Sequence, residues 1–169
     1  PDGDEAKRGG KGIAVRKGLE IAIGDIVIIQ DADLEVSPEE YPSLLKYILS
    51  NESEVVFGSR FMSKDSKFRF MSLLANKILN FLTNKLYNTK ISDVMTCYKV
   101  FKVDILKDMK FECNGFDFDA ELVTKVLKKG IPIRDVPIGY FPRTYGQGKK
   151  INWKDGFSSL YVIIKSKFF

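Results

Sequence analysis

The sequence predicts an α/β fold in which helices flank a mostly parallel sheet, and two apolar runs lead to this prediction. Residues 26–29 read IVII, an uninterrupted β-branched run bounded by Gly24 and Asp25, and residues 54–58 read EVVFG. Short apolar runs of this kind are typical of strands buried on both faces, such as those in the middle of a parallel sheet. Helical patterns lie before, between and after the two runs, which is the order expected of α/β units.

The composition indicates one globular domain. The chain has 169 residues, of which 44% are hydrophobic and 29% charged, with a net charge of +5. That length supports a single core, so we expect residues 1–169 to form one domain. The moderate positive charge suits phosphate-bearing partners or an anionic membrane surface, and by itself it does not indicate nucleic acid, which we do not expect as a partner.

Several functional classes are excluded or disfavoured by residue usage. Histidine is absent, which rules out a histidine-based triad, metal ligand or general base. The two cysteines, Cys97 and Cys113, occur without a signal peptide and indicate a reducing, cytoplasmic setting. No apolar run reaches the ~20 residues of a membrane span. Because the chain starts at Pro1 without a methionine and stops inside an apolar stretch, we expect it to be a fragment that lacks its first portion.

The first expected elements are a basic loop and two helices on either side of the first strand. Residues 2–12 are rich in glycine and include Lys11, a combination that can contact phosphate oxygens, although it fits no phosphate-loop pattern and a solvated loop is the simpler interpretation. Apolar spacing predicts a helix over 13–23. A second helix is predicted from the cap Ser37 to about Ser50, with Pro38 at its first position and Glu40 completing a capping box.

Three carboxylates follow the first strand at alternate positions: Asp31, Asp33 and Glu35. A chain that leaves a strand in near-extended geometry points alternate residues the same way, so the three can converge. Hard oxygen ligands suit Mg²⁺ or Mn²⁺, and the carboxyl ends of strands are where open α/β sheets bind ligands. The alternative to a metal site is a structural turn that happens to be acidic. An EF-hand loop is excluded because Val36 replaces its glycine and Pro42 its glutamate.

Three further charged residues are expected near the same edge of the sheet. Arg60 follows the second strand, where it suits either a phosphate or a surface ion pair. Asp93 lies in a loop before an alternating strand over 98–101, as a pocket carboxylate or a turn cap. The last strand, 133–141, leads to Arg143 and then to a glycine-containing loop with Lys149, which is placed to close over an anion.

Three remaining helices are predicted over 66–87, 115–129 and 153–169. The first carries the stripe Phe70, Leu74, Ile78, Phe81 and Leu82 beside basic residues, a pattern that fits either a half-buried helix or a membrane surface. The second has acidic residues in its first turn, including Glu121, which complement the helix dipole. The third is aromatic-rich and amphipathic, so it suits either interfacial anchoring or ordinary packing.

With these elements in order, the chain resembles the family-two glycosyltransferases of the GT-A (Rossmann-like) fold, and within them the dolichyl- or polyprenyl-phosphate sugar synthases. The resemblance covers nearly the whole chain and rests on the segments KGIAVRKGLEIAIGD, DADLE, SPEE, VVFGSRF, SDVMTCYKVF, GFDFDAEL and YFPRTYGQGKKINWKDG. The opening βα units of the family, which bind the base and ribose, have no counterpart in these residues.

The resemblance implies a role for each matched position. Asp31 and Asp33 match the pair that binds Mg²⁺ or Mn²⁺ and, through it, the diphosphate of a nucleotide sugar, with Glu35 as a third metal ligand and Lys11 at the donor. Glu35 stands where mannosyl synthases carry glutamine, which favours a UDP-sugar such as UDP-glucose over GDP-mannose. The remaining expectations are Arg60 and Arg69 at the acceptor phosphate, Asp93 near the donor sugar, and Arg143 with Lys149 on phosphates. Asp33, Asp93 and Arg143 are the expected catalytic residues.

The implied reaction is an inverting attack by a lipid phosphate on the anomeric carbon, carried out at the cytoplasmic face of a membrane. Three alternatives stay open at this point. A polysaccharide-building family-two enzyme would need a catalytic base, for which Glu121 is placed. A nucleotidyltransferase would release pyrophosphate instead of a nucleoside diphosphate. A fragment without its nucleotide-binding half would be inactive.

Overall fold

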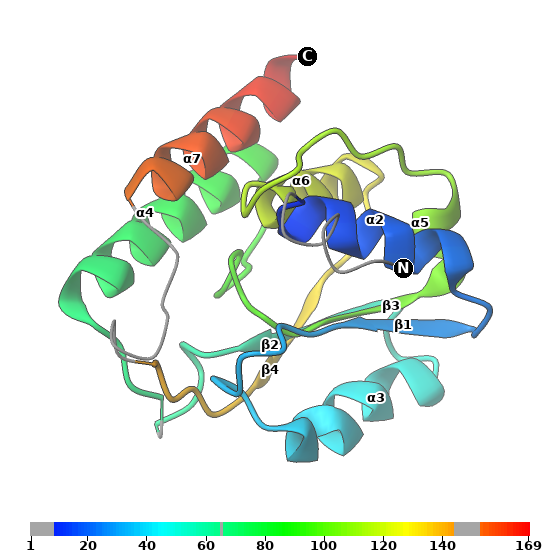
Figure 1. Ribbon diagram of the computed structural model, residues 1–169. Helices are drawn as coiled ribbons and strands as arrows, with labels where there is room; N and C mark the ends of the chain where they lie inside the picture. The colour runs from blue at the N-terminus through cyan, green and yellow to red at the C-terminus, as the bar shows by residue number, and fades with distance from the viewer. Residues whose placement is uncertain (1–8, 65, 144–152) are drawn as a thin grey trace.

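The protein is described by a computed structural model that covers residues 9–64, 66–143 and 153–169. Helices and strands alternate along most of this chain (Figure 1). Their order is α2 (Lys11–Ile21), β1 (Ile26–Ile29), the 3₁₀ turn η1 (Pro38–Glu40), α3 (Tyr41–Leu49), β2 (Val55–Ser59), α4 (Phe70–Tyr87), β3 (Lys99–Lys102), α5 (Val103–Lys107), α6 (Phe118–Lys128), β4 (Arg134–Pro137) and α7 (Trp153–Phe168). The predicted alternation is therefore confirmed, with α5 as an additional element.

The four strands form one mixed sheet in the order β1-β3-β2-β4. β3 runs antiparallel to both of its neighbours, whereas β2 and β4 pair in parallel. Three strands thus point the same way, and one reversed strand lies between β1 and β2. The expectation that residues 26–29 occupy the middle of the sheet is wrong for this arrangement: β1 pairs with β3 only, among the described residues, and its first three residues are half-buried.

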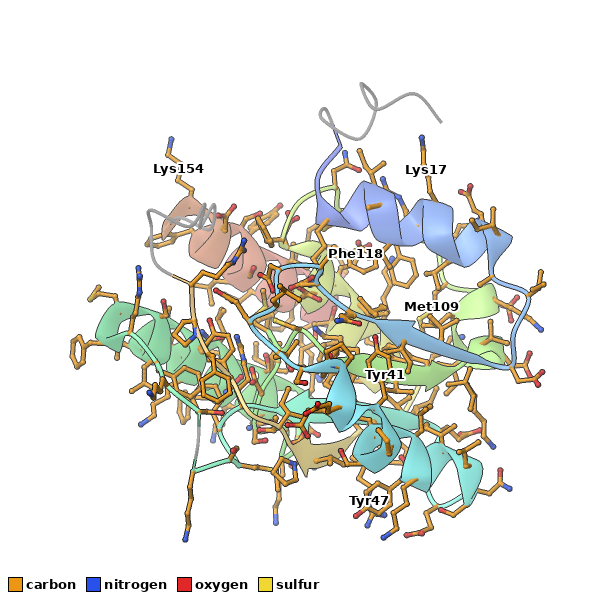
Figure 2. The ribbon with its side chains drawn as sticks, turned by 60° about the horizontal axis from the view of Figure 1, so that its bottom comes forward. Lys17, Tyr41, Tyr47, Met109, Phe118 and Lys154 are labelled. Carbon is orange, nitrogen blue, oxygen red and sulfur yellow. The ribbon has the colours of Figure 1, made fainter. Side chains whose placement is uncertain are left out.

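Helices cover both faces of the sheet (Figure 1). One face packs against α3 through a core that includes Leu44, Val56 and Tyr98. The other packs against α2, α5 and α6 through a core that includes Phe57 and Phe118. Figure 2 shows Phe118 and Tyr47 on opposite sides of the sheet.

The N-terminal end of α2 lies unusually close to the loop before α6. The Gly12 N–H donates to the Asn114 carbonyl at 2.9 Å. A Cβ atom on Gly12 would stand 2.2 Å from the Cys113 carbonyl oxygen, and one on Gly10 would stand 2.3 Å from the Asn114 oxygen. Glycine is required at both positions because only a residue without a side chain permits this approach. The contact fixes Lys11, which lies between the two glycines.

Helix α4 turns its polar side inward and its apolar stripe outward. Asn80 accepts a hydrogen bond from the Val94 N–H at 2.9 Å, and Asn84 accepts one from the Ile91 N–H at 2.9 Å while donating to the Ile91 carbonyl. On the opposite side, Phe70 is 75% exposed and Phe81 67% exposed. The expectation of a half-buried apolar stripe is therefore wrong, because the amides must reach backbone groups of the 91–94 loop that lack other partners.

Helix α7 packs beside α4 and against α6. It also leaves apolar side chains exposed, namely Phe157, Tyr161, Ile164 and Phe168. In the part of the chain that the structure describes, no helix is both long and apolar enough to cross a membrane.

Candidate active site at the strand ends

The chain turns directly after β1, and this turn separates the three predicted metal ligands. Leu34 takes a φ of 60°, a left-handed conformation that is uncommon outside glycine. Asp33 Oδ1 accepts a hydrogen bond from the Glu35 N–H at 3.2 Å. Alternate residues share a direction only in an extended chain. The three carboxylates consequently form no metal-binding group of three, nor do any other described residues.

Glu35 links two loops instead of facing the site. Its side chain is buried and accepts hydrogen bonds from the Tyr140 hydroxyl at 3.1 Å and the Arg143 N–H at 2.8 Å. Its own carbonyl accepts from the Phe141 N–H at 2.9 Å. Burial and the neighbouring Glu35 carboxylate raise the pKa of Tyr140 above its ordinary value, so the hydroxyl stays a donor. Glu35 thus ties the segment after β1 to the segment after β4, and the expectation that it binds metal is corrected.

Asp33 and Arg143 are brought together by this link. Arg143 Nη2 lies 2.9 Å from Asp33 Oδ2. Arg143 Nε lies 3.7 Å from Glu35 Oε1 and is buried with no hydrogen-bond partner among the described residues. Arg69 Nη2 donates to the Arg143 carbonyl at 3.1 Å, which places the expected acceptor arginine beside the expected phosphate-binding one. Lys149, the other predicted phosphate ligand, lies outside the described residues.

Asp31 is paired with Lys11, which the packing of α2 has placed there. Lys11 Nζ lies 2.9 Å from Asp31 Oδ1 and 2.7 Å from Asp119 Oδ2. Burial alone would lower the pKa of Lys11, but Asp119 and Asp31 outweigh it and raise that pKa. Lys11 therefore lies beside the Asp31 carboxylate, and its expected role at the donor stays a prediction.

The arrangement of Asp31 and Asp33 fits a divalent cation that shares its coordination with phosphates. Their side chains stay 25% and 20% exposed, and each is now balanced by one protein cation. Mg²⁺ is usually held by one or two carboxylates together with substrate phosphates, so two such groups are a sufficient protein donor set. The Arg143 guanidinium, whose side chain is 33% exposed, is a donor group that an anionic ligand in the site can contact.

Arg60 and Asp93 form a buried ion pair with each other. Arg60 Nε and Nη2 donate to the two Asp93 oxygens at 2.7 and 2.8 Å, and the Arg60 N–H donates to Asp93 Oδ2 at 3.1 Å. Nη2 also donates to the Met95 carbonyl at 2.9 Å, and the guanidinium lies 5.0 Å from the centre of the Tyr140 ring. Burial would lower the pKa of Arg60, but Asp93 outweighs it and raises that pKa.

This geometry corrects two expectations together. Arg60 is buried and directs Nε and Nη2 to Asp93 and a backbone carbonyl instead of to an acceptor phosphate, and Asp93 has no exposed surface for a donor sugar. The pair instead joins the end of β2 to the loop before β3. Asp135 of β4 adds to this join, because it accepts hydrogen bonds from the Ser92 N–H and hydroxyl, each at 2.6 Å.

The Glu121 carboxylate also pairs with groups of the protein. It accepts hydrogen bonds from the Glu112 and Cys113 N–H groups, both at 2.9 Å, and pairs with Lys125 at 2.8 Å. Burial would raise its pKa, but Lys125 and the two N–H groups outweigh it and hold the pKa below its ordinary value. A carboxylate stabilised in this way is a poor proton acceptor.

The residues that sequence reasoning missed are Lys99 and Asp119. Lys99 is fully buried on β3, and its Nζ lies 2.7 Å from Asp119 Oδ1. A lysine inside the apolar run Tyr98–Phe101 was an available signal, because lysine is almost never buried without a partner. Its partner lies 20 residues away on α6 and could not be identified from spacing.

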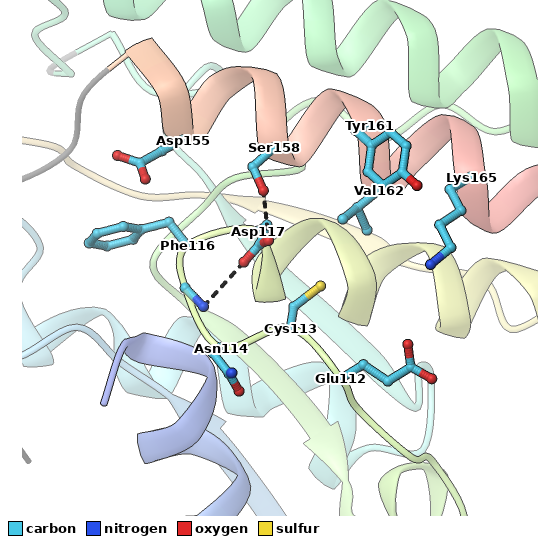
Figure 3. A pocket seen from close by; sticks show the side chains of 11 residues that line it. Glu112, Cys113, Asn114, Phe116, Asp117, Asp155, Ser158, Tyr161, Val162 and Lys165 are labelled. Carbon is cyan, nitrogen blue, oxygen red and sulfur yellow. Dashed lines mark hydrogen bonds between the residues drawn. The ribbon is translucent and has the colours of Figure 1, made fainter. Parts of the chain in front are cut away.

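A cavity of about 520 Å³ opens between the 112–117 loop and α7 (Figure 3). Ser158 donates to Asp117 Oδ2 at 2.7 Å across it. Its charged lining residues are Glu112, Asp117, Asp155 and Lys165, so carboxylates outnumber ammonium groups. This lining repels a phosphate group and suits hydroxyl-bearing or cationic ligands.

Comparison of the sequence with known proteins gives several matches. The Glycosyl transferase family 2 model matches residues 4–110. The low-salt glycan biosynthesis hexosyltransferase Agl6 of Haloferax volcanii is 28% identical over 159 residues, which is 92% of this chain. An uncharacterized protein of Methanocaldococcus jannaschii is 24% identical over 167 residues, which is 95% of this chain and 69% of that protein.

Solved structures share the fold. Glucosyl-3-phosphoglycerate synthase from Mycobacterium tuberculosis in complex with UDP superposes with a TM-score of 0.71 at 19% identity over 95% of this chain. Its complex with Mn²⁺, UDP-glucose and glycerol 3-phosphate gives 0.70 at 18% identity. The similarity confirms the expected GT-A fold. The chain spans 56% of the length of that synthase and 37% of the length of the Haloferax hexosyltransferase.

Proposed function

This chain belongs to glycosyl transferase family 2, and on that premise we propose that it is part of an enzyme that moves a sugar from a nucleotide sugar to a polyprenyl or dolichyl phosphate. The observation that carries the proposal is the pairing of Asp31 with Lys11 and of Asp33 with Arg143 at one edge of the sheet. Two accessible carboxylates beside two cations suit a metal-bound diphosphate, since the metal takes the carboxylates and the cations take phosphate oxygens.

Asp31 and Asp33 would hold Mg²⁺ or Mn²⁺, which supplies Lewis-acid neutralisation of charge on the departing diphosphate. The chain's own cations do the rest. Arg143 presents a planar, partly exposed guanidinium for phosphate oxygens. Lys11 presents a single ammonium charge, fixed by the close packing of α2. Both groups are in place before the ligand arrives, so little reorganisation is needed when negative charge develops.

An anionic acceptor is consistent with the lack of a free carboxylate at the position of Glu121, the candidate general base. A phosphate oxygen is already charged at neutral pH, so its attack requires no strong general base. Glu121, the base that a polysaccharide-building enzyme would need, is occupied by two backbone N–H groups and Lys125. We infer that Arg69 and Arg143 receive the acceptor phosphate, because they adjoin each other near Asp33, whereas the cavity beside α7 is acidic.

The proposal is tested by incubating the full-length protein with UDP-glucose or GDP-mannose, Mn²⁺ or Mg²⁺, and one of three acceptors. These are a polyprenyl phosphate, 3-phosphoglycerate, and a neutral oligosaccharide. We expect release of a nucleoside diphosphate and a glycosylated lipid phosphate. Transfer only to 3-phosphoglycerate or to the oligosaccharide would replace the acceptor, and release of pyrophosphate would contradict glycosyl transfer altogether.

The outward apolar stripe of α4 supports a membrane surface as the partner of this enzyme. Phe70, Met71 and Phe81 are each more than 60% exposed, and the helix also exposes Lys77 and Lys85. Apolar side chains flanked by lysines suit the boundary between acyl chains and anionic headgroups. The net charge of +5 acts in the same direction. We therefore propose peripheral binding at the cytoplasmic face of a membrane, where a lipid phosphate would be presented.

Replacing Phe70 and Phe81 with serine is expected to weaken sedimentation with vesicles of phosphatidylcholine and phosphatidylglycerol. Each lost side chain should reduce partitioning by about tenfold, because it removes a buried aromatic group from the lipid. The matched control replaces Ile21 and Ile23 with serine; both are more exposed than the two phenylalanines, and they lie at and just after the end of α2. Equal losses in both pairs would contradict a specific surface. A concentration-dependent dimer abolished only by the α4 changes would identify a second copy as the partner.

A further inference from the structure

Four charged side chains form a continuous line from the interior of the sheet to the candidate metal site. Lys99 Nζ lies 2.7 Å from Asp119 Oδ1, and Asp119 Oδ2 lies 2.7 Å from Lys11 Nζ. Lys11 Nζ then lies 2.9 Å from Asp31 Oδ1. Lys99 and Asp119 are buried, whereas Asp31 is partly exposed. The signs alternate along the line, and each Asp119 oxygen takes one lysine.

The pKa values of the side chains in this line depend on their neighbours in the line. Burial would raise the pKa of Asp119, but Lys11 and Lys99 outweigh it and hold that pKa below its ordinary value, so the group is a carboxylate. Burial lowers the pKa of Lys99, and Asp119 offsets this only in part. Lys11 therefore divides its positive charge between a fully buried carboxylate and Asp31. How strongly it neutralises Asp31 depends on Asp119.

Neither Lys99 nor Asp119 reaches the site directly. Asp119 contacts Asp31 only through the Lys11 ammonium, and Lys99 contacts Lys11 only through Asp119, among the contacts described. Lys11 itself can move little at its backbone, because Gly10 and Gly12 lie directly against the 113–114 carbonyls. Its ammonium contacts both carboxylates at once, at 2.7 Å from Asp119 and 2.9 Å from Asp31.

We propose that Asp119, held in place by Lys99, is a positioning residue that draws the Lys11 ammonium away from Asp31 and so keeps Asp31 able to bind a divalent cation. The inference rests on the proposed function, because it concerns the same metal-binding carboxylate. Without Asp119, the ammonium pairs with Asp31 alone and competes with the incoming ion. Residues that orient metal ligands in this indirect way typically change metal affinity by about 10–100-fold when replaced.

The test is a double-mutant cycle on Mn²⁺ affinity, measured by titration calorimetry with Mn²⁺ alone on the full-length protein. Asp119→Asn is expected to weaken Mn²⁺ binding by about 10–100-fold. In a Lys11→Met background the same change is expected to have an effect of less than about twofold, because the competing ammonium is gone. Additive effects would overturn the proposal, since a general field or folding effect of Asp119 does not require Lys11.

Two further measurements keep the result interpretable. Asp119→Asn leaves Lys99 buried without its carboxylate, so the variant Lys99→Met/Asp119→Asn removes both charges and is expected to fold and to show the same loss of Mn²⁺ affinity. Normal Mn²⁺ affinity in that folded variant would contradict the proposal. Asp104→Asn, on an exposed carboxylate of α5, is the control and should leave binding unchanged. If the parent protein binds no Mn²⁺, the proposed function itself fails, and this inference fails with it.

Discussion

Replacing Asp33 with alanine in the full-length protein is expected to lower kcat/KM for sugar transfer by about 10²–10³-fold. Asp33 is one of the two accessible carboxylates at the end of β1, and its partner Arg143 lies 2.9 Å away. The change removes a cation ligand and releases Arg143 from its fixed position. Charge on the departing diphosphate is then less well balanced. The measurement is release of the nucleoside diphosphate at saturating Mn²⁺, with the Mn²⁺ dependence of the rate as a second readout.

The matched control is Asp104→Ala, which removes a carboxylate of the same type from an exposed ion pair on α5. It should change neither the rate nor the Mn²⁺ dependence. Because Asp33 is partly exposed, its loss should leave the thermal unfolding transition close to that of the parent. Activity of Asp33→Ala equal to that of the parent would remove a metal at this position from the mechanism.

Replacing Asp93 with alanine is expected to lower the free energy of unfolding by about 3–5 kcal/mol. Asp93 is fully buried and accepts three hydrogen bonds from Arg60. The alanine variant leaves a buried guanidinium without its counter-charge, which is among the most destabilising single changes. Since domains are stable by only about 5–15 kcal/mol, the loss is a large fraction of the total. Urea denaturation followed by far-ultraviolet circular dichroism gives the value.

A paired variant separates this structural role from a role at the donor sugar. Arg60→Met/Asp93→Leu removes both charges and should recover part of the stability, because no unpaired buried charge remains. If Asp93→Ala instead unfolds like the parent while losing activity, Asp93 is available to ligands and the buried pair does not form in solution. Asp104→Ala again serves as the exposed control and should leave the urea midpoint unchanged.

The helices and strands could be predicted from the sequence, because hydrophobic periodicity and capping residues indicate them. The run at 26–29 and the run at 54–58 became β1 and β2, and Ser37 caps η1, where its hydroxyl accepts from the Glu39 N–H. The order of the strands could not be predicted, because a run of apolar residues does not indicate which strand it pairs with or in which direction. In the structure β3 lies between β1 and β2 and runs opposite to both, and its alternating pattern did not predict this position.

For the site, the sequence predicted a set of charged residues but not how they pair. Asp31, Asp33 and Arg143 lie at one edge of the sheet because they follow parallel strands, and the starts of α2 and α4 bring Lys11 and Arg69 to them. Glu35, Arg60 and Asp93 were assigned to ligands and are held by protein partners instead. Each of those partners is distant in sequence, as Tyr140 is from Glu35.

The sequence by itself determined the α/β class, the existence of the strands and the family to which the chain belongs, because these follow from local residue order. It did not determine every strand end, since the strand predicted over 133–141 ends at Pro137. Only the tertiary structure decided which carboxylates stay accessible to a cation and which are consumed by internal pairing. It also decided that the apolar side of α4 faces outward. The physical reason is the same in both cases. Buried polar groups must find partners, and those partners are supplied by whichever elements the packing brings near.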